Sequence, residues 1–569
     1  MIKTLTLKFG ATGNSPGLRL DPLRTTVFVG PNNSGKSLLL REIQTFIEGN
    51  RSSIRKILGR IDPLYPEPDQ AEKMLDSRIS SAKSPTDIQK GNVLVQAIDP
   101  SKSIPRYLQL DRAPMMDFIR SNWSEQSLGT QGTAADEIWV GVFSHFVSLF
   151  TIALDGKTRF TLVEPREAGD LLLTPTNHLA ALFTDDRARA RVREVTADAL
   201  GLFFTIDPTQ LGKLKIRMAA RAPKDTAEEQ ALDLRARDYH AEATDIAELS
   251  DGVKAFTGIV SALISSDYRV ILIDEPEAFL HPSLARKLGS VAAQLASERS
   301  ANIFASTHSA HFLMGCIDSG APLNIVRLTY QGQKPTARVL LHEKLVALMK
   351  DPLLRSTRVL DALFHSSAIV CEADRDRAFY EEINLRLSAA GRTSIADGLF
   401  LNAQNKQTIH RVTQPLREMG IPAAAVVDFD ILKGQDLKRL LDACFVPPAE
   451  VHALTTLRGD IEAKFISAGS KNWRISLLTG SDRDACTSLL SQLRAFGIFV
   501  VPDGAVEVWL REFSSGASKE AWLITVFDRM RSDPKMADYV RPAEGDVWEF
   551  AIWIATWVAN LQRRGMPTS

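Results

Sequence analysis

A glycine-rich loop near the start of the chain limits the folds that this sequence can adopt more than any other feature. Residues 30–37 read Gly-Pro-Asn-Asn-Ser-Gly-Lys-Ser, directly after the β-rich run 25–29 and before a helical stretch at 37–46. Between a strand and a helix, such a loop cradles phosphate groups with backbone N–H groups and the helix N-terminus. It therefore predicts an α/β fold with a nucleotide site formed by Gly30, Pro31, Asn32, Asn33, Ser34, Gly35, Lys36 and Ser37.

Lys36 and Ser37 have the clearest chemical roles in this loop. The lysine is expected to reach the β- and γ-phosphates of ATP, and the serine hydroxyl is expected to ligate Mg²⁺. The alternative is a glycine-rich turn that contains a lysine by accident. That alternative loses weight because other parts of a nucleotide-hydrolysing site follow downstream.

Three later segments supply those parts. The apolar run 271–273 ends in Asp274 and Glu275, which are predicted to hold Mg²⁺ and to deprotonate the attacking water. His308 follows the apolar run 302–305 and is predicted to face the γ-phosphate. The Ser250-Asp251-Gly252 step lies shortly before the acidic strand, where a simple helix N-cap is the alternative reading for Ser250.

Length, charge and composition favour a multidomain protein without a membrane segment. A chain of 569 residues is expected to form two to four domains. Its 68 basic and 68 acidic side chains cancel, so DNA would have to bind through local patches or bridging metals. The four cysteines form no Cys-x-x-Cys pair, so the sequence indicates neither a zinc site nor a disulfide framework. No apolar stretch is long enough to span a bilayer, which predicts a cytoplasmic protein without a membrane segment.

A second group of acidic residues appears after the pattern of strands and helices restarts near residue 345. The strand-like run 368–371 ends in Glu372, with Asp376 one helical turn later, and the run 423–427 ends in Asp428 and Asp430. Glu372 and Asp428 are expected to converge from adjacent parallel strands. Hard oxygen ligands suit Mg²⁺ or Mn²⁺, and a pair of such ions can assist phosphodiester cleavage.

Further upstream, the segments 150–154 and 158–163 flank Asp155-Gly156, which predicts a β-hairpin. The proline-rich stretch 51–135 is predicted to be an insertion with helical pieces.

The order of the N-terminal motifs resembles the ABC-type ATPases of the chromosome-maintenance and recombination-mediator class. The phrase Asp-Glu-Pro-Glu-Ala-Phe-Leu-His-Pro at 274–282 strengthens the resemblance, since similar phrases occur in DNA-repair and phage-defence members. It implies an ATP-sandwiched homodimer or dimer-based oligomer, in which Ser250 and Gly252 cap the nucleotide of the opposite subunit. The chain lacks heptads long enough for an extended coiled-coil arm.

The C-terminal acidic pattern resembles a TOPRIM fold, which is Rossmann-like, and the whole chain resembles the overcoming-lysogenization-defect (OLD) family of endonucleases. The resemblance implies an ABC-type ATPase domain at 1–345, including the insertion at 51–135 and a candidate dimerisation region at 165–240, and a TOPRIM nuclease domain at 365–569. It also implies Glu507 as a further metal ligand and Lys519 as a residue that assists cleavage. Members of this family often carry Glu-Gly where this chain has Glu372-Ala373.

The resemblance implies an ATP-regulated, metal-dependent DNA endonuclease of antiphage defence, which can act with a defence-system partner protein. A topoisomerase- or primase-like protein is disfavoured, because no strand-passing tyrosine domain or zinc cluster is recognisable. The remaining alternative is a non-cleaving DNA-clamp or repair ATPase whose TOPRIM domain is a scaffold. The intact acids argue for the nuclease.

Overall fold

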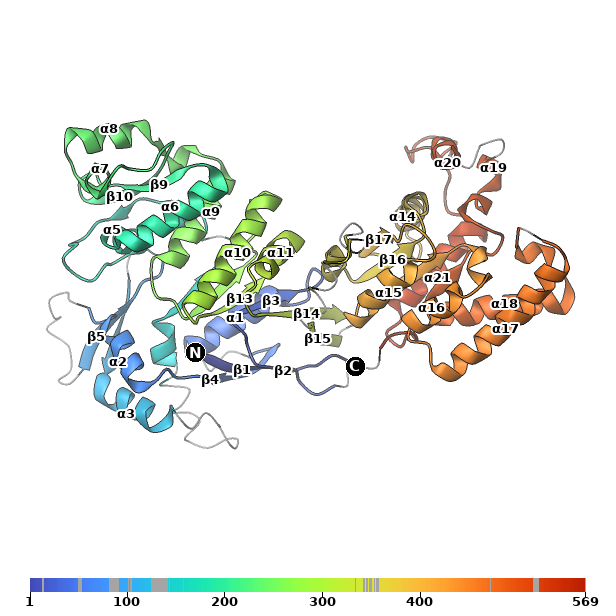
Figure 1. The fold of residues 1–569 in the computed structure, drawn as a ribbon, viewed down its shortest axis with the longest axis horizontal. Helices are drawn as coiled ribbons and strands as arrows, with labels where there is room; N and C mark the ends of the chain where they lie inside the picture. Colours follow the sequence, from blue (N-terminus) through green and yellow to red (C-terminus); the bar gives the residue numbers. More distant parts are fainter. Residues whose placement is uncertain are drawn as a thin grey trace. The chain divides into compact units, whose positions relative to one another are not determined.

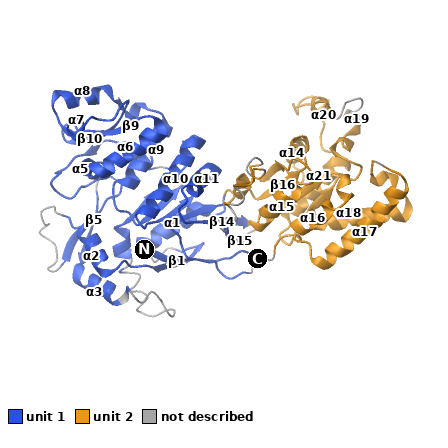
Figure 2. Ribbon diagram, in the orientation of Figure 1, with its two compact units in different colours: residues 1–29, 33–330, 335–342 blue, residues 30–32, 331–334, 343–569 orange. Residues whose placement is uncertain are grey.

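A computed structural model describes most of the chain. The described residues are 1–12, 15–49, 54–80, 92–100, 102, 105–123, 142, 144–156, 158–332, 334–340, 343, 346, 350–352, 354, 358–470, 472–514 and 521–567. The chain divides into two compact units, coloured separately in Figure 2. Unit 1 contains residues 1–29, 33–330 and 335–342, and unit 2 contains residues 343–569 with the short segments 30–32 and 331–334.

A six-stranded sheet lies at the centre of unit 1, with strand order β15-β14-β3-β13-β12-β7 (Figure 1). The strands are β3 (Thr25–Val29), β7 (Thr151–Leu154), β12 (Val270–Asp274), β13 (Asn302–Ser306), β14 (Leu323–Gln331) and β15 (Lys334–Leu340). From β14 to β7 every neighbouring pair is parallel. Every residue of β3 and β13 and the first four residues of β12 are buried, which fits strands covered on both faces.

Two helices on this sheet pack so closely that glycine is required at their contact. They are α10 (Pro282–Glu298) and α11 (Ala310–Asp318). A Cβ atom on Gly289 would lie 2.2 Å from the Phe312 carbonyl oxygen, and one on Gly315 would lie 1.9 Å from that of Arg286. Helix α10 follows the acidic strand and α11 follows His308, so this close contact holds the two segments together.

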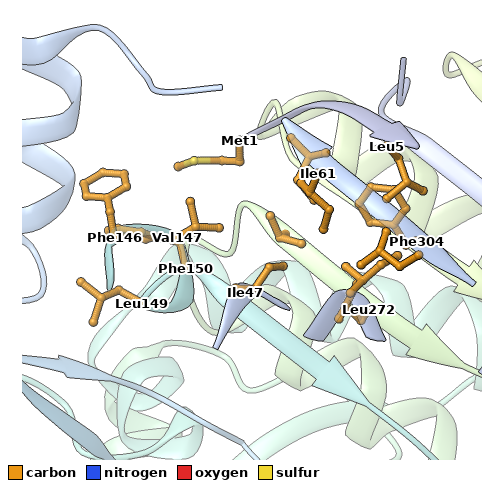
Figure 3. Close-up of a cluster of buried hydrophobic side chains, with 14 of the residues drawn as sticks. Met1, Leu5, Ile47, Ile61, Phe146, Val147, Leu149, Phe150, Leu272 and Phe304 are labelled. Carbon is orange, nitrogen blue, oxygen red and sulfur yellow. The ribbon is translucent and has the colours of Figure 1, made fainter. Parts of the chain in front are cut away.

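The core of unit 1 joins the central sheet to the first helix and to a smaller antiparallel sheet. That sheet has the order β2-β1-β4, from Arg19–Leu20, Ile2–Leu7 and Leu58–Pro63. Figure 3 shows Leu5 and Ile61 of these strands beside Leu272 and Phe304 of the central sheet and Ile47 of helix α1 (Lys36–Ile47). Burial of these apolar side chains fixes α1, and with it Lys36, relative to the strands.

The stretch predicted as an insertion contains strands as well as helices. Its described elements are β4, α2 (Pro68–Asp76), β5 (Asn92–Ala97), β6 (Arg106–Asp111) and α3 (Arg112–Asn122). The stretch also contributes to the fold, because β4 pairs with β1.

The region from residue 165 to 250 forms a small sheet with helices. Its elements are β8 (Arg166–Glu167), α5 (His178–Thr184), α6 (Asp186–Leu200), β9 (Phe203–Asp207), β10 (Lys213–Ala219), α7 (Thr226–Gln230), α8 (Leu234–Glu242) and β11 (Thr244–Asp245). Strand β10 pairs with β8, β9 and β11. Helix α9 (Asp251–Ile264) follows and leads to β12.

The hairpin predicted at 150–163 is wrong. Strand β7 pairs in parallel with β12 instead, and the second apolar run forms the 3-10 turn η1 (Thr161–Val163). The Asp155 carboxylate accepts a hydrogen bond from the Thr158 N–H at 2.9 Å, so Asp155-Gly156 begins a local turn rather than a strand reversal.

Unit 2 is built on a four-stranded parallel sheet with the order β17-β16-β18-β19. Its strands are β16 (Ser367–Cys371), β17 (Gly398–Asn402), β18 (Ala423–Val427) and β19 (Ile498–Val500). Helices α14 (Asp374–Ala389), α15 (Ile409–Glu418), α16 (Asp436–Ala443), α17 (Pro448–Ser467), α18 (Gly480–Ala495), α19 (Arg511–Ser514), α20 (Trp522–Met530) and α21 (Asp546–Ala559) complete it (Figure 1). Trp548 and Trp557 of α21 are buried in the core.

Candidate functional sites

The glycine-rich loop connects β3 to α1, as its composition requires. Gly30, Asn33 and Gly35 have φ angles of 142°, 59° and 94°, which residues other than glycine and asparagine rarely adopt. Lys36 is the first residue of α1, and its ammonium group donates a hydrogen bond to the Ser34 hydroxyl at 3.3 Å. The loop therefore places a lysine and several left-handed turns at the N-terminus of a helix, where anions bind.

Lys36 is poised between burial and acidic neighbours. Burial lowers the pKa of its ammonium group to about 8, although the carboxylates of Glu275, Glu277 and Asp274 act in the opposite direction. A bound triphosphate would add negative charge beside this group and favour its charged form.

The acidic strand ends beside the neighbouring strand β13. The Ser306 hydroxyl donates a hydrogen bond to the Asp274 carboxylate, and the Glu275 N–H donates to the Ser306 carbonyl at 2.9 Å. Glu275 is exposed, with a left-handed φ of 50°. Its backbone is therefore fixed by the sheet while its carboxylate is accessible to a ligand.

Glu277 connects the acidic strand to His308. Its carboxylate accepts hydrogen bonds from the Thr307 hydroxyl at 2.8 Å and from the His308 N–H at 2.6 Å. Burial, more than the nearby Glu275 charge, raises the pKa of Glu277. Burial, followed by the charge of Lys36, lowers the pKa of His308, which favours its neutral form.

Ser250 stands at the N-cap position of α9, yet its side chain makes no capping hydrogen bond. Gly252 lies in the first turn of that helix, and a Cβ atom there would be 3.0 Å from the Phe279 carbonyl oxygen. The Ser250 hydroxyl therefore does not cap helix α9 in this structure.

Comparisons with known proteins address the ATPase part of the chain. Residues 174–314 match a family model described as "AAA domain, putative AbiEii toxin, Type IV TA system". That segment contains Ser250, the acidic strand and His308, and the phosphate-binding loop lies upstream of it. The match places an ATPase domain in unit 1. No curated protein matches the chain.

Solved structures of SMC head domains are also similar to the chain at low identity. One is the SmcHead bound to the C-winged helix domain of ScpA, at 14% identity, with a TM-score of 0.35, covering 61% of this chain and 99% of that one. A second is the SMC head domain of Thermotoga maritima, at 14% identity and a TM-score of 0.28, covering 60% and 99%. A third, from Pyrococcus furiosus, is an Smc head domain with an extended coiled coil bound to the C-terminal domain of ScpA, at 12% identity and a TM-score of 0.28, covering 61% and 98%.

Outside the ATPase domain, unit 2 brings its acidic residues to one edge of the parallel sheet. Glu372 follows β16 and Asp428 follows β18, and these strands are neighbours. The Asp428 N–H donates a hydrogen bond to the Glu372 carboxylate at 2.9 Å. Ala373 has a φ of −130°, an ordinary extended angle, so the backbone at this position does not require glycine.

Charge is unbalanced at this edge. Burial and the negative charge of its neighbours raise the pKa of Asp428 to about 8. Those neighbours are Glu372, Asp376, Asp430 and Glu507. Burial, followed by the charges of Asp430 and Asp376, likewise raises the pKa of Glu372 to about 7, and burial raises the pKa of Asp376.

Two basic side chains hold the rim of this acidic cluster, which consists of Glu372, Asp376, Asp428, Asp430 and Glu507. The ammonium group of Lys406 lies 2.8 Å from the Asp430 carboxylate. Arg375 lies between two acids, 3.1 Å from the Glu507 carboxylate and 3.4 Å from that of Asp376. The largest charge effects on the Asp428 carboxylate come from the other four acids of the cluster.

The acidic cluster fits a divalent cation in its chemistry, because every donor is a hard carboxylate oxygen and the excess charge is negative. Among the described residues, however, no three histidine, cysteine or acidic side chains are arranged to hold a metal ion. Lys519 lies outside the described residues.

Among the described helices, none is long and apolar enough to cross a membrane.

Sequence reasoning did not identify Lys406, Arg375, Glu277 or Arg159, the arginine whose guanidinium donates hydrogen bonds to the Asp274 and Ala278 carbonyls at 2.8 Å. Glu277 lies within the quoted phrase 274–282, so its position two residues after Glu275 was the available signal. Lys406 and Arg159 carry no local signal, because each meets its partners only through the tertiary fold.

Proposed function

We propose that this protein is an ATP-regulated, divalent-metal-dependent DNA endonuclease. The observation that carries the proposal is the acidic cluster at the carboxyl ends of adjacent parallel strands in unit 2, where burial and mutual repulsion raise the pKa values of Glu372 and Asp428. Perturbed carboxyl groups gathered at one edge of an α/β sheet are typical of functional sites.

Mg²⁺ or Mn²⁺ bound to such carboxylates would polarise a phosphodiester and lower the pKa of an attacking water. The residues that would hold the ions are Glu372, Asp376, Asp428, Asp430 and Glu507. Glu372 is oriented by the Asp428 N–H, which occupies one of its carboxylate oxygens. Arg375 and Lys406 would orient the outer acids and attract the phosphate backbone. Lys519 stays a proposed assistant in cleavage.

A plasmid cleavage assay tests this function. Wild-type protein should cut DNA with Mg²⁺ or Mn²⁺ and stop with a chelator, and Glu372→Ala, Asp428→Ala and Glu507→Ala should each abolish cutting. The matched control is Asp374→Asn, because Asp374 lies on the same stretch of chain but pairs with Arg377 at 2.7 Å. Cleavage by the three alanine variants at the wild-type rate would contradict the assignment.

A non-cleaving DNA-clamp or repair ATPase is the second candidate. It is favoured by one observation: no three of the described acidic side chains converge as metal ligands. If wild-type protein cuts no form of DNA with any metal or nucleotide, yet binds DNA when ATP is present, this candidate replaces the first.

The same proposal includes a homodimer that sandwiches ATP. Its support is the Ser250 hydroxyl, which is exposed and makes no capping bond in its own subunit. In the dimer this hydroxyl and the Gly252 N–H would contact the γ-phosphate held by Lys36 of the opposite subunit. Light scattering of a Glu275→Gln variant should show ATP-dependent dimers, and a monomer at every concentration with and without ATP would refute the arrangement.

A role in antiphage defence, with a partner protein of the same system, belongs to the same proposal. The match to a domain described as a toxin of type IV toxin–antitoxin systems supports it. Phage plating on cells that carry the wild-type gene or the Asp428→Ala variant would test the role, and equal plating on both would count against it.

A further inference from the structure

The turn after the acidic strand is anchored by a buried arginine from a different part of unit 1. Arg159 follows β7 and is 1% exposed. Its guanidinium group donates hydrogen bonds to the carbonyl oxygens of Asp274 at 2.8 Å, of Ala278 at 2.8 Å and of Glu275. One side chain therefore binds three backbone carbonyls of the segment that contains the proposed general base.

This turn has a backbone that its own sequence does not favour. Glu275 and Phe279 have left-handed φ angles of 50° and 69°, although neither is glycine or asparagine. Such conformations persist only where the surroundings hold them in place. The Phe160 ring adds a contact next to Arg159, because it packs edge-on against Phe279 with the ring centroids 5.1 Å apart.

We propose that Arg159 is a positioning residue for ATP hydrolysis, which holds Glu275 in the backbone conformation that directs its carboxylate to the attacking water. The φ and ψ angles of Glu275 set the direction of its Cα–Cβ bond and limit its rotamers, so the carbonyls that Arg159 binds restrict where the Glu275 carboxylate can point. The hydrogen bonds of the Arg159 side chain go to backbone carbonyl oxygens of this turn.

Arginine suits this role because its planar guanidinium offers five donors in a fixed geometry. A lysine at this position would have its three donors on one nitrogen at the end of a flexible stem, whereas Arg159 uses two nitrogens to reach its three carbonyls. Methionine keeps much of the volume and removes every donor. Both changes leave Lys36, Ser37 and Asp274 intact, so nucleotide binding is expected to persist.

Steady-state ATP hydrolysis by the full-length chain tests the proposal. Arg159→Met should lower kcat by about 10²-fold, the size of loss that follows a misplacement of about 1 Å. KM should change by less than about threefold, since the phosphate-binding loop is untouched. Arg159→Lys should lie between the wild type and Arg159→Met.

Arg299→Met is the matched control. Arg299 also donates to three backbone carbonyls, those of Leu263, Ile264 and Ser266, but these are at the far end of helix α9 from Ser250. If both methionine variants lose kcat in step with their thermal unfolding midpoints, Arg159 acts only on stability and the proposal fails.

A double variant separates action through Glu275 from an independent effect. If Arg159 acts through Glu275, then Arg159→Met combined with Glu275→Gln should hydrolyse ATP within about threefold of Glu275→Gln alone, because the carboxylate that it positions is already gone. A further loss as large as that in the single Arg159→Met variant would overturn the proposal, as would an Arg159→Lys variant with unchanged kcat.

Discussion

The two sites differ most in how their charges are balanced. In the ATPase site, Lys36 lies among Asp274, Glu275 and Glu277, and hydrogen bonds from Ser306 and Thr307 hold two of those acids. In the acidic cluster, the largest charge effects on Asp428 come from four acids, and Arg375 and Lys406 pair with Glu507 and Asp430. The first site balances its charges with its own side chains, whereas the proposed function assigns a cation from solution to balance the second.

This difference predicts how each site responds to protonation. The proposed ATPase site assigns distinct roles to Lys36 as phosphate ligand and to Glu275 as base. The acidic cluster shares its charge among five carboxylates, so protonation of one member can partly relieve the others.

The largest effect expected from the difference between the two sites is on the rate of ATP hydrolysis. Lys36→Ala or Glu275→Gln should lower the rate by about 10²–10⁴-fold, the range for loss of a positioned acid–base group. Phosphate release should be measured alongside the acidic-cluster variant Asp428→Ala, which is expected to hydrolyse ATP nearly as fast as the wild type. Near-normal turnover in both ATPase-site variants would remove the assignment of that site.

A smaller effect concerns stability against pH. The carboxyl groups of Glu372 and Asp428 have pKa values near 7 and 8 in the folded chain, above their ordinary values of 4.5 and 3.8. Between about pH 4 and pH 8 the folded state therefore holds more protons than the unfolded state, and the stability of metal-free protein falls as pH rises through this window.

Asp428→Asn removes part of that penalty. Relative to wild type, it should raise the thermal unfolding midpoint in chelator at about pH 8.5, and the difference should shrink at about pH 5. Asp374→Asn should not raise it, because the pKa of Asp374 is lowered by its hydrogen bond from Arg377. If the difference in unfolding midpoint between Asp428→Asn and wild type does not change with pH, then the neighbouring acids do not destabilise the Asp428 carboxylate.

The elements that sequence alone could predict are those whose signals are local and strong. The apolar runs at 270–273, 302–305, 368–371 and 423–427 correspond to β12, β13, β16 and β18, because strands buried on both faces are continuously apolar. The loop 30–37 carries its own backbone requirements in its glycines. These signals were enough to predict a P-loop α/β fold.

The failures came from partners that are distant along the chain. The Asp155-Gly156 pair suggested a hairpin, but β7 found its partner in β12 more than a hundred residues later. Arg159 and Lys406 are ordinary in sequence, and only the fold brings their donors to the acidic turn and to Asp430. Local patterns of apolar and polar residues do not predict contacts between residues that are distant along the chain.

Titration of Mn²⁺ into nucleotide-free protein tests the contrast between the two sites most directly. At about pH 7.5, calorimetry in buffers of different ionisation enthalpy should show that wild-type protein binds Mn²⁺ and releases protons, since Glu372 and Asp428 are partly protonated before the metal enters. Asp374→Asn should behave like wild type, and Asp428→Ala should lose both the uptake and the proton release. Absence of uptake in the wild type, or the same uptake with the same proton release in Asp428→Ala, would contradict a cation site at the acidic cluster.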